Sequence, residues 1–256
     1  MKAWLAFTKK EWLEQLRSGK LLILAILFFA FGVMNPAIAK LTPWLLETMS
    51  ASLEESGMTV TAVTVDALTS WTQFFKNIPM ALIIFVVAEA GIFTKEYQSG
   101  SLILSLTKGL RRSQVVLSKT CVLGILWTAG YWLCFGVTYL YTGYYWDQSI
   151  LQNLMVAVTA WWLMGLWVVM LTVLFSTLFK TNTGVILGCG GVFLASYLLG
   201  MIPRLEEYVP TMLMNGMPVL MGAVLPADLW RSIVVTGVLT TASVAAAVPI
   251  FDRKSL

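Results

Sequence analysis

Residues 154–179 read LMVAVTAWWLMGLWVVMLTVLFSTLF, a run without a single charged side chain. About 20 apolar residues in a helix are enough to cross the hydrocarbon core of a bilayer, so this run predicts a spanning helix that tilts or extends beyond the core. Only residues 180–183 separate it from a second apolar run, 184–202. The two runs therefore predict an antiparallel pair of membrane-spanning helices.

Apolar runs of similar length occur elsewhere in the chain, at 21–39, 77–94, 120–140 and 232–251. Of the 256 residues, 58% are hydrophobic and only 12% are charged, whereas a soluble domain is about one quarter charged. This composition excludes a single soluble catalytic domain. It predicts an all-α integral membrane protein in which six transmembrane helices form one domain over residues 1–256.

The sequence contains no histidine, which excludes a Ser/His or Cys/His nucleophile pair, an HExxH zinc site and a haem with an axial histidine. Cys121, Cys134 and Cys189 all lie within apolar runs, where we expect them to pack rather than to form a disulfide or a metal site. We therefore expect no catalytic residue and no metal ligand. The net charge of +4 indicates a basic cytoplasmic face and not a nucleic-acid surface.

The basic residues are distributed unevenly between the two sides of the six predicted spans. With the N-terminus in the cytoplasm, only four of the 17 Lys and Arg residues lie outside, at Lys40, Lys76, Arg204 and Arg231. Because cytoplasmic loops are enriched in Lys and Arg, this bias places both termini in the cytoplasm.

The N-terminal residues allow two interpretations. Basic residues, an apolar run and the Ala-Ile-Ala at 37–39 resemble a secretory signal with a cleavage site. We favour an amphipathic helix over residues 3–19 that lies on the inner membrane surface. Its apolar stripe and its charged face are formed by Leu5, Trp12, Leu13 and Leu16 and by Lys9, Lys10, Glu14 and Arg17, respectively.

Three segments between the spans are long enough to have structure of their own. Residues 40–76 predict a small external loop with one or two short helices. Within 203–231, the stretch 211–225 is apolar but too short to cross, and predicts a re-entrant or interfacial helix pair. A loop packed on the helix ends is an equally open reading of that stretch.

The third segment, 97–119, predicts a short helix over 100–106, a turn at 108–109 and a second helix that continues into the third span. Its basic residues are explained by cytoplasmic topology and contact with anionic lipid. They do not explain an apolar helix in the cytoplasm, and exposed apolar surface of that kind usually binds a partner.

Residues 95–119, KEYQSGSLILSLTKGLRRSQVVLSK, resemble the signature that follows the second span in type-2 ABC exporter permeases. In that family a Glu precedes a Gly-Ser-Leu helix, and a turn, an Arg and a Lys lead into the third span. Gly109 stands where proline is common. Residues 9–20 are similar to the family's elbow helix, and 251–254 to its usual end.

The resemblance implies a permease that pairs with a second copy or a related permease and binds two ATP-binding-cassette ATPases. Because the chain has no GxxxxGK[ST] phosphate loop, it is not expected to be an enzyme or to hold a cofactor: ATP and Mg belong to the partner. The expected location is a bacterial cell membrane. The residues implied in coupling to the ATPase are Glu96, Gly100, Ser101, Leu102, Leu104, Leu106, Arg111 and Arg112.

Glu89 is the one acidic residue well inside a predicted span, and such a residue faces a cavity or a partner. A substrate contact and a structural hydrogen bond are both open for it. Phe85 shares its helical face, and Gly188 lies in the fifth span, where close helix packing is the main alternative. Glu96 either pairs with Arg111 or Arg112 or is separately solvated.

The short chain, without a large external domain, looks most like permeases that export peptide toxins or confer immunity to antimicrobial peptides. Amphipathic or hydrophobic peptides are therefore the expected substrates, with drugs or lipids as the alternative. A stand-alone channel or secondary transporter would predict more ionisable residues in the spans and inverted repeats, and neither is evident.

Overall fold

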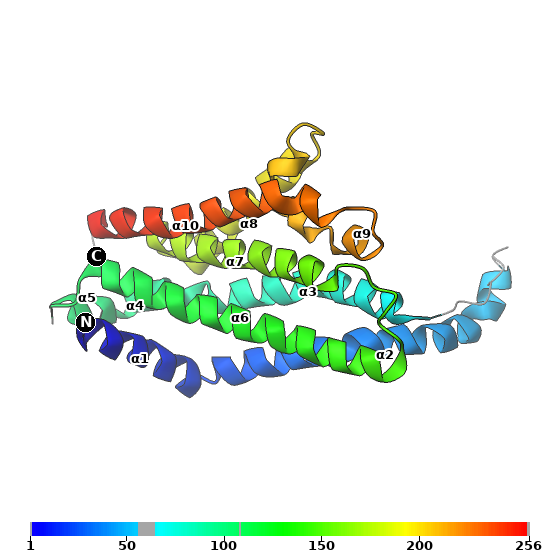
Figure 1. Cartoon of the computed structure of the whole chain (residues 1–256). Coiled ribbons are helices and arrows are strands. Elements are labelled where there is room, and N and C mark those ends of the chain that lie inside the picture. The colour runs from blue at the N-terminus through cyan, green and yellow to red at the C-terminus, as the bar shows by residue number, and fades with distance from the viewer. Residues whose placement is uncertain (1, 56–64, 108, 255–256) are drawn as a thin grey trace.

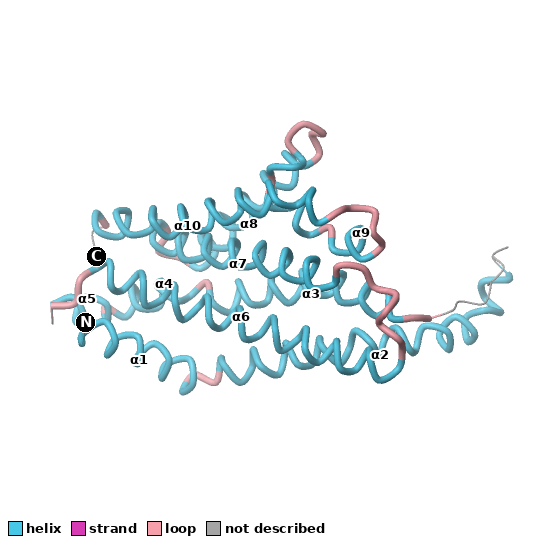
Figure 2. The backbone as a smooth tube through the Cα atoms, in the orientation of Figure 1, coloured by secondary structure: helices cyan, strands magenta, loops and turns pink. Residues whose placement is uncertain are grey.

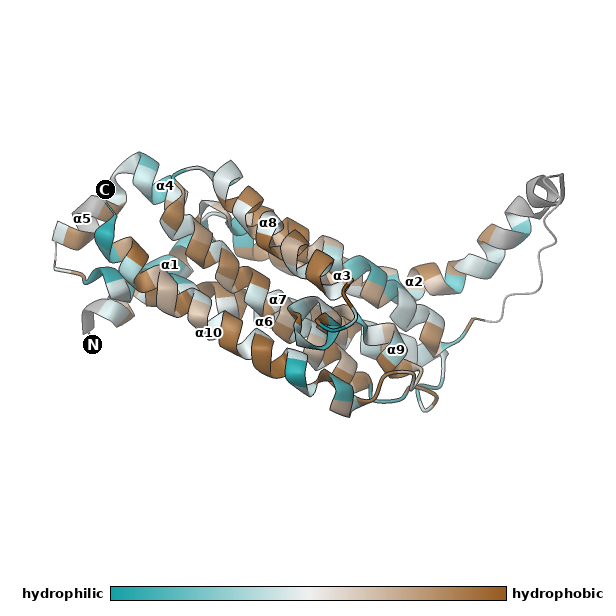
Figure 3. Ribbon diagram, turned by 90° about the horizontal axis from the view of Figure 1, so that it is seen from above, coloured by the Kyte–Doolittle hydropathy of each residue, from teal (hydrophilic) through white to brown (hydrophobic). Residues whose placement is uncertain are grey.

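The computed structural model describes residues 2–55, 65–107 and 109–254. The helices form an elongated bundle with both chain termini at the same end, which we call the terminal end (Figure 1). Most loops lie toward the two ends of the bundle, whereas the loop that follows α8 projects from its side (Figure 2). Hydrophobic residues dominate the middle of the bundle, and hydrophilic residues are more frequent toward its ends (Figure 3).

Six helical segments are long and apolar enough to cross a membrane, and the described residues contain no strand, which confirms the predicted fold class. The helices are α1 (Lys2–Arg17), α2 (Lys20–Glu55), α3 (Ala67–Glu89), α4 (Gly91–Ser99), α5 (Ser101–Thr107), α6 (Arg112–Tyr145), α7 (Leu154–Leu178), α8 (Asn182–Gly200), α9 (Gly216–Leu220) and α10 (Trp230–Arg253), with short 3-10 turns η1 (Glu206–Tyr208), η2 (Pro210–Met214) and η3 (Pro226–Leu229).

The segment 40–76, predicted as an external loop with one or two short helices, is helical over most of its described part, where the two flanking helices extend into it; residues 56–64 lie outside the described residues, and the external position stays a prediction. Helix α2 continues to Glu55, and α3 already begins at Ala67. The predicted span 21–39 ended just before Lys40 and Pro43. The Lys40 ammonium lies 3.4 Å from the centroid of the Tyr145 ring, and proline is tolerated inside spanning helices, so neither residue ends α2. At 1.5 Å per residue, α2 is about 54 Å long and extends well beyond a hydrocarbon core of about 30 Å.

An aromatic cluster joins four of the spanning helices at the centre of the bundle. The Trp127 ring contacts the rings of Phe28 and Phe85, with centroids 5.9 and 5.7 Å away, and Tyr131 stacks on Trp161 at 6.4 Å. These residues belong to α2, α3, α6 and α7, and their side chains are almost fully buried. The burial of several large rings fixes these four helices against one another.

Side-chain hydrogen bonds connect α2, α3 and α6 away from the aromatic cluster. The Asn35 amide donates to Thr138 Oγ1 at 3.1 Å and accepts from the Asn77 amide at 2.9 Å, and the Thr138 hydroxyl donates to the carbonyl of Gly32 at 3.1 Å. Such bonds stabilise helix pairs in membranes, where an unpaired polar group is costly.

The helix pair predicted for 211–225 consists of two very short helical elements, η2 and α9, which are followed by a turn. Leu213, Gly216 and Leu220 are buried, and a Cβ at Gly216 would lie 2.3 Å from the Phe75 ring. The segment therefore packs against α3 and α7, at the end of the bundle away from the termini (Figure 1). Its predicted re-entrant position in the membrane stays a prediction.

Candidate functional site

Four charged side chains meet near the terminal end and connect α1, α4 and α6. Lys119 Nζ lies 2.8 Å from Glu11 Oε2 and 2.9 Å from Glu96 Oε2. Lys10 Nζ bonds the other oxygens of the same two carboxylates, Glu11 Oε1 at 3.0 Å and Glu96 Oε1. We call this closed ring of alternating charges (Lys10, Glu11, Lys119 and Glu96) the charged quartet.

Three members of the charged quartet are withdrawn from solvent, since Lys119, Glu11 and Glu96 are only 1%, 4% and 5% exposed. Lys119 makes a further bond of 2.9 Å to the carbonyl of Ile92. Burial alone would lower the pKa of Lys10, but the carboxylates around it raise that pKa above the usual value. Buried charges are costly unless they are paired, and the quartet pairs each of its charges and carries no net charge, although Glu96 Oε2 is ion-paired with Lys119 without a hydrogen bond.

The carboxylates of Glu11, Glu14 and Glu96 lie within 4.8 Å of one another, a spacing suited to a metal ion. The Lys10 ammonium, however, forms ion pairs with all three, at 3.0 Å from Glu11 and 2.9 Å from Glu14 and in close contact with Glu96. A lysine side chain therefore supplies the positive charge that a metal would bring.

The charged quartet connects α4 and α6, the helices that precede and follow α5. Glu96 precedes α5 on α4, and Lys119 follows it on α6. Gly100 and Gly109 reverse the chain on either side of α5 with φ of 66° and 88°, a conformation that glycine adopts without strain. Helix α5 consequently lies at the terminal end of the bundle (Figure 1).

The residues implied in coupling are divided between the core and the surface. Leu102 is buried, and Leu106 packs partly against the core, whereas Arg111 is exposed and Gly100 and Ser101 are half-buried. The Leu104 side chain lies outside the described side chains. Both open readings of Glu96, pairing with Arg111 or Arg112 and separate solvation, are wrong, because Glu96 is buried and its two oxygens contact Lys10 and Lys119.

Arg112 instead caps the end of α10. Its Nη1 donates to the carbonyls of Phe251, Asp252 and Lys254 at 2.9, 3.1 and 2.6 Å. Lys254 Nζ in turn donates to the carbonyls of Thr177 and Phe179 at the end of α7, at 2.7 and 3.2 Å. Cations at helix C-termini satisfy the last free carbonyls, so residues 251–254 tie α6, α7 and α10 together.

Lys254 is expected to titrate far below an ordinary lysine. Burial, and secondarily the nearby Lys180, lower the pKa of Lys254 from 10.5 to about 8. Between these values the unfolded chain binds more protons than the folded chain, so the contribution of Lys254 to stability rises as the pH rises from about 8 to 10.5. NMR of ¹³C-methylated lysines should show its midpoint near pH 8, moving upward in Lys180→Gln; a midpoint at about 10.4 in the folded protein would contradict this.

Glu89 is fully buried and forms a second ionic contact between α1, α2 and α3. Its Oε2 accepts from Gln15 Nε2 at 2.8 Å and lies 3.1 Å from Lys20 Nζ. Phe85 belongs to the aromatic cluster, and Gly188 packs so closely that a Cβ there would lie 2.5 Å from the Phe175 ring. The structure does not bring Phe85, Glu89 and Gly188 together around a common space.

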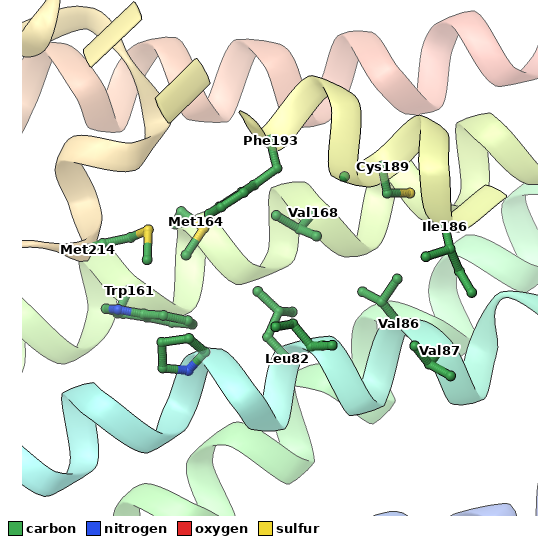
Figure 4. A pocket seen from close by; sticks show the side chains of 13 residues that line it. Leu82, Val86, Val87, Trp161, Met164, Val168, Ile186, Cys189, Phe193 and Met214 are labelled. Carbon is green, nitrogen blue, oxygen red and sulfur yellow. The ribbon is translucent and has the colours of Figure 1, made fainter. Parts of the chain in front are cut away.

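A cavity of about 310 Å³ does lie nearby, between α3, α7, α8 and η2 (Figure 4). Leu82 and Val86 of α3 face Trp161 and Met164 of α7 across it, and Phe193 of α8 closes one side. None of the three predicted substrate-path residues lines it. Sequence reasoning missed the cavity because its lining comes from four separate elements, and each contributes only ordinary apolar residues.

Sequence reasoning also missed the side of α1 that packs on the bundle. Phe7, Glu11 and Gln15, each four residues apart, face the bundle, whereas Leu5 and Leu16 of the predicted apolar stripe are exposed. The exposed leucines fit the predicted contact with a membrane surface, which stays a prediction. Glu11 and Gln15 are polar residues four positions apart beside the leucine stripe, and this spacing was the sign in the sequence that α1 has a separate side facing the bundle.

Comparison with known proteins identifies a family of membrane transporters that the chain matches. Residues 5–256 match the family described as ABC-2 family transporter protein. The chain is also 23% identical over 215 residues to the uncharacterized transmembrane protein YxlG of Bacillus subtilis (strain 168), covering 82% of this chain and 81% of that protein. The family match extends over nearly the whole sequence, and the chain therefore belongs to the ABC-2 transporter family, as a membrane permease component that associates with an ATP-binding-cassette subunit.

Proposed function

We propose that this chain is the permease of an ATP-driven exporter in which two permease copies work with two ATPase subunits. Membership of the ABC-2 family supports the permease role and the need for an ATPase partner. The observation that carries the proposal is the attachment of α5 to the charged quartet. Glu96 before α5 is paired with Lys119 after it, and Lys119 is also paired with Glu11 of α1.

In this proposal α5 is the coupling helix that contacts the ATPase. A displacement of α5 on ATP binding moves α4 and α6 together, because the quartet joins them, and α1 moves with them. Packed cores transmit such displacements as rigid-body shifts of whole helices, since they are not continuously deformable. The movement then reaches the spans, and the permease alternates between access to the two sides of the membrane.

The distribution of charge supports a cytoplasmic location for the terminal end. Of the 17 basic residues, 13 are assigned to the side that carries both termini and α5. Lys and Arg are retained on the cytoplasmic side, where the ATPase and its ATP are also found. On this basis we propose that both termini lie inside, and the resemblance to type-2 ABC exporter permeases supports a bacterial cell membrane and export as the direction of transport.

Amphipathic or hydrophobic peptides are the proposed substrates. The cavity between α3, α7 and α8 supports a substrate with apolar surface, and it offers no charged lining residue to recognise a hydrophilic one. Hydrophobic drugs and lipids share this chemistry and are the second candidates. Transport of labelled peptide and of labelled lipid into inverted vesicles would separate them.

Assembly with the ATPase is the direct test of the proposed function. We expect the chain to co-purify with its ATP-binding-cassette partner subunit when the two are co-expressed. Leu104→Glu should reduce the recovered ATPase about tenfold or more, because the proposal places α5 in an apolar contact, where a charge is costly to bury. Ala227→Glu, an exposed position of η3 away from the terminal end, is the matched control. No capture by the unaltered chain would refute the proposal.

A further inference from the structure

The helices that precede and follow α5 share a second contact, apart from the charged quartet. Tyr97 lies on α4 directly after Glu96, and Arg112 is the first residue of α6. The ring of Phe251, near the end of α10, has its centroid 6.5 Å from that of the Tyr97 ring and 5.8 Å from the Arg112 guanidinium carbon. Because Phe251 is fully buried, α4 and α6 are both packed on the end of α10.

Hydrogen bonds extend this contact to the end of α7. The Arg112 guanidinium donates to three carbonyls between Phe251 and Lys254, and Lys254 Nζ donates to two carbonyls at the end of α7. The Tyr97 hydroxyl donates to the carbonyl of Ser176 at 3.2 Å, and the Lys254 ammonium lies 4.2 Å from the centroid of the Tyr97 ring. We call these four side chains (Tyr97, Arg112, Phe251 and Lys254) the C-terminal clasp.

The charged quartet and the C-terminal clasp connect α5 to different helices. The quartet joins α4 and α6 to α1, whereas the clasp joins α4 and α6 to α7 and α10. Neighbouring residues belong to the two groups, since Glu96 is part of the quartet and Tyr97 is part of the clasp. Helices α7 and α10 are also packed closely against each other, so they are expected to move as one body.

We propose that the C-terminal clasp transmits the displacement of α5 to α7 and α10, with Arg112 and Lys254 as its positioning residues. This inference rests on the proposed function, in which the ATPase displaces α5. It divides the transmission into two parts: the quartet carries the displacement to α1, and the clasp carries it to the α7–α10 pair. Arg112 then acts inside the permease and is not a contact of the ATPase.

Arg112→Gln and Arg253→Gln form a matched pair of variants for the test. Arg112→Gln removes the cation that satisfies the last free carbonyls of α10. The Arg253 side chain is close in sequence to the clasp, but it is exposed and forms no hydrogen bond or ion pair with another described residue. Both variants lose one positive charge at the same end of the bundle, and only the first opens the clasp.

The experiment is hydrogen exchange, read by mass spectrometry, of the permease in complex with its ATP-binding-cassette partner subunit, with and without Mg-ATP and vanadate. In the unaltered complex and in Arg253→Gln, nucleotide should change the exchange of peptides from α1, α5 and the ends of α7 and α10. In Arg112→Gln the response of α1 and α5 should persist. The response of the α7 and α10 ends should fall about tenfold, because a hydrogen bond from a charged donor changes an equilibrium by about that factor or more.

The nucleotide response separates transmission from a purely structural role. If Arg112 only stabilises the fold, exchange at the ends of α7 and α10 rises in Arg112→Gln but still responds to nucleotide, which overturns the proposal. Loss of the response at α5 as well would make Arg112 a contact of the ATPase, and this result overturns it too. If nucleotide changes no peptide of the unaltered complex, including α5, the proposed function itself fails and the inference falls with it.

A conservative pair keeps the proposal testable if Arg112→Gln yields no complex. Arg112→Lys retains a cation near the same carbonyls, but a lysine ammonium is a single point donor and lacks the guanidinium geometry. Its nucleotide response at α7 and α10 should fall about threefold relative to Arg253→Lys, a smaller loss than in Arg112→Gln. Identical responses of Arg112→Lys and Arg253→Lys would overturn the role of the clasp.

Discussion

Lys119→Met is expected to lower the free energy of unfolding by about 3–5 kcal/mol, the usual cost of removing one partner from a buried ion pair. Lys119 is 1% exposed and lies within 2.9 Å of both Glu11 and Glu96. Without it, two buried carboxylates face each other with only Lys10 to compensate them. Titration with sodium dodecyl sulfate in mixed micelles measures the change.

Two further variants test whether the loss of stability in Lys119→Met comes from unpaired buried charge. Lys10→Met should cost less than Lys119→Met, because the Lys10 side chain is 44% exposed and water can replace part of its contribution. Adding Glu11→Gln to Lys119→Met removes one of the two unpaired carboxylates and should recover about half of the lost stability. If Lys119→Met and Lys10→Met are equally mild, the charged quartet does not hold α1, α4 and α6 together.

Glu89→Ala is expected to lower the free energy of unfolding by about 2–3 kcal/mol, because it leaves Lys20 and Gln15 without their shared acceptor. The loss is smaller than at Lys119, since the Lys20 side chain is 21% exposed. Glu89→Gln keeps an oxygen that accepts from Gln15 and should cost less than Glu89→Ala. Denaturation of both variants under the same conditions provides the comparison.

Transport by Glu89→Gln decides between the two roles that the sequence left open for this residue. The ionic contact with α1 and α2 favours a structural role, so we expect the relative transport of cationic and neutral peptides to stay unchanged. A selective loss of cationic peptide transport, with normal stability, would instead assign Glu89 to the substrate path.

Most of the fold was accessible from the sequence because long apolar runs have few alternatives in a membrane. The runs at 154–179 and 232–251 agree with α7 and α10 to within two residues. The outer end of α2 was missed since Lys40 and Pro43 break the apolar pattern without breaking the helix. Hydropathy finds where a helix must be apolar, but not how far it continues outside the hydrocarbon core.

The site was harder to predict because it depends on partners distant in the chain. Glu96 was singled out, but its partners Lys10 and Lys119 are 86 and 23 residues away, and nearby arginines seemed the natural choice. Arg112 is directed to the C-terminal carbonyls of α10 instead. Proximity in sequence predicts pairs only within one helix, and here the pairing is set by how α1 packs on α6.

The central claim is that this chain couples to an ATPase through α5 and the charged quartet. It is tested most directly by ATP hydrolysis in proteoliposomes that contain the chain and its ATP-binding-cassette partner subunit. We predict that hydrolysis depends on the chain, and that it falls strongly in Leu104→Glu but not in Ala227→Glu. Hydrolysis that is the same with and without the chain, or the same in both variants, would contradict the account.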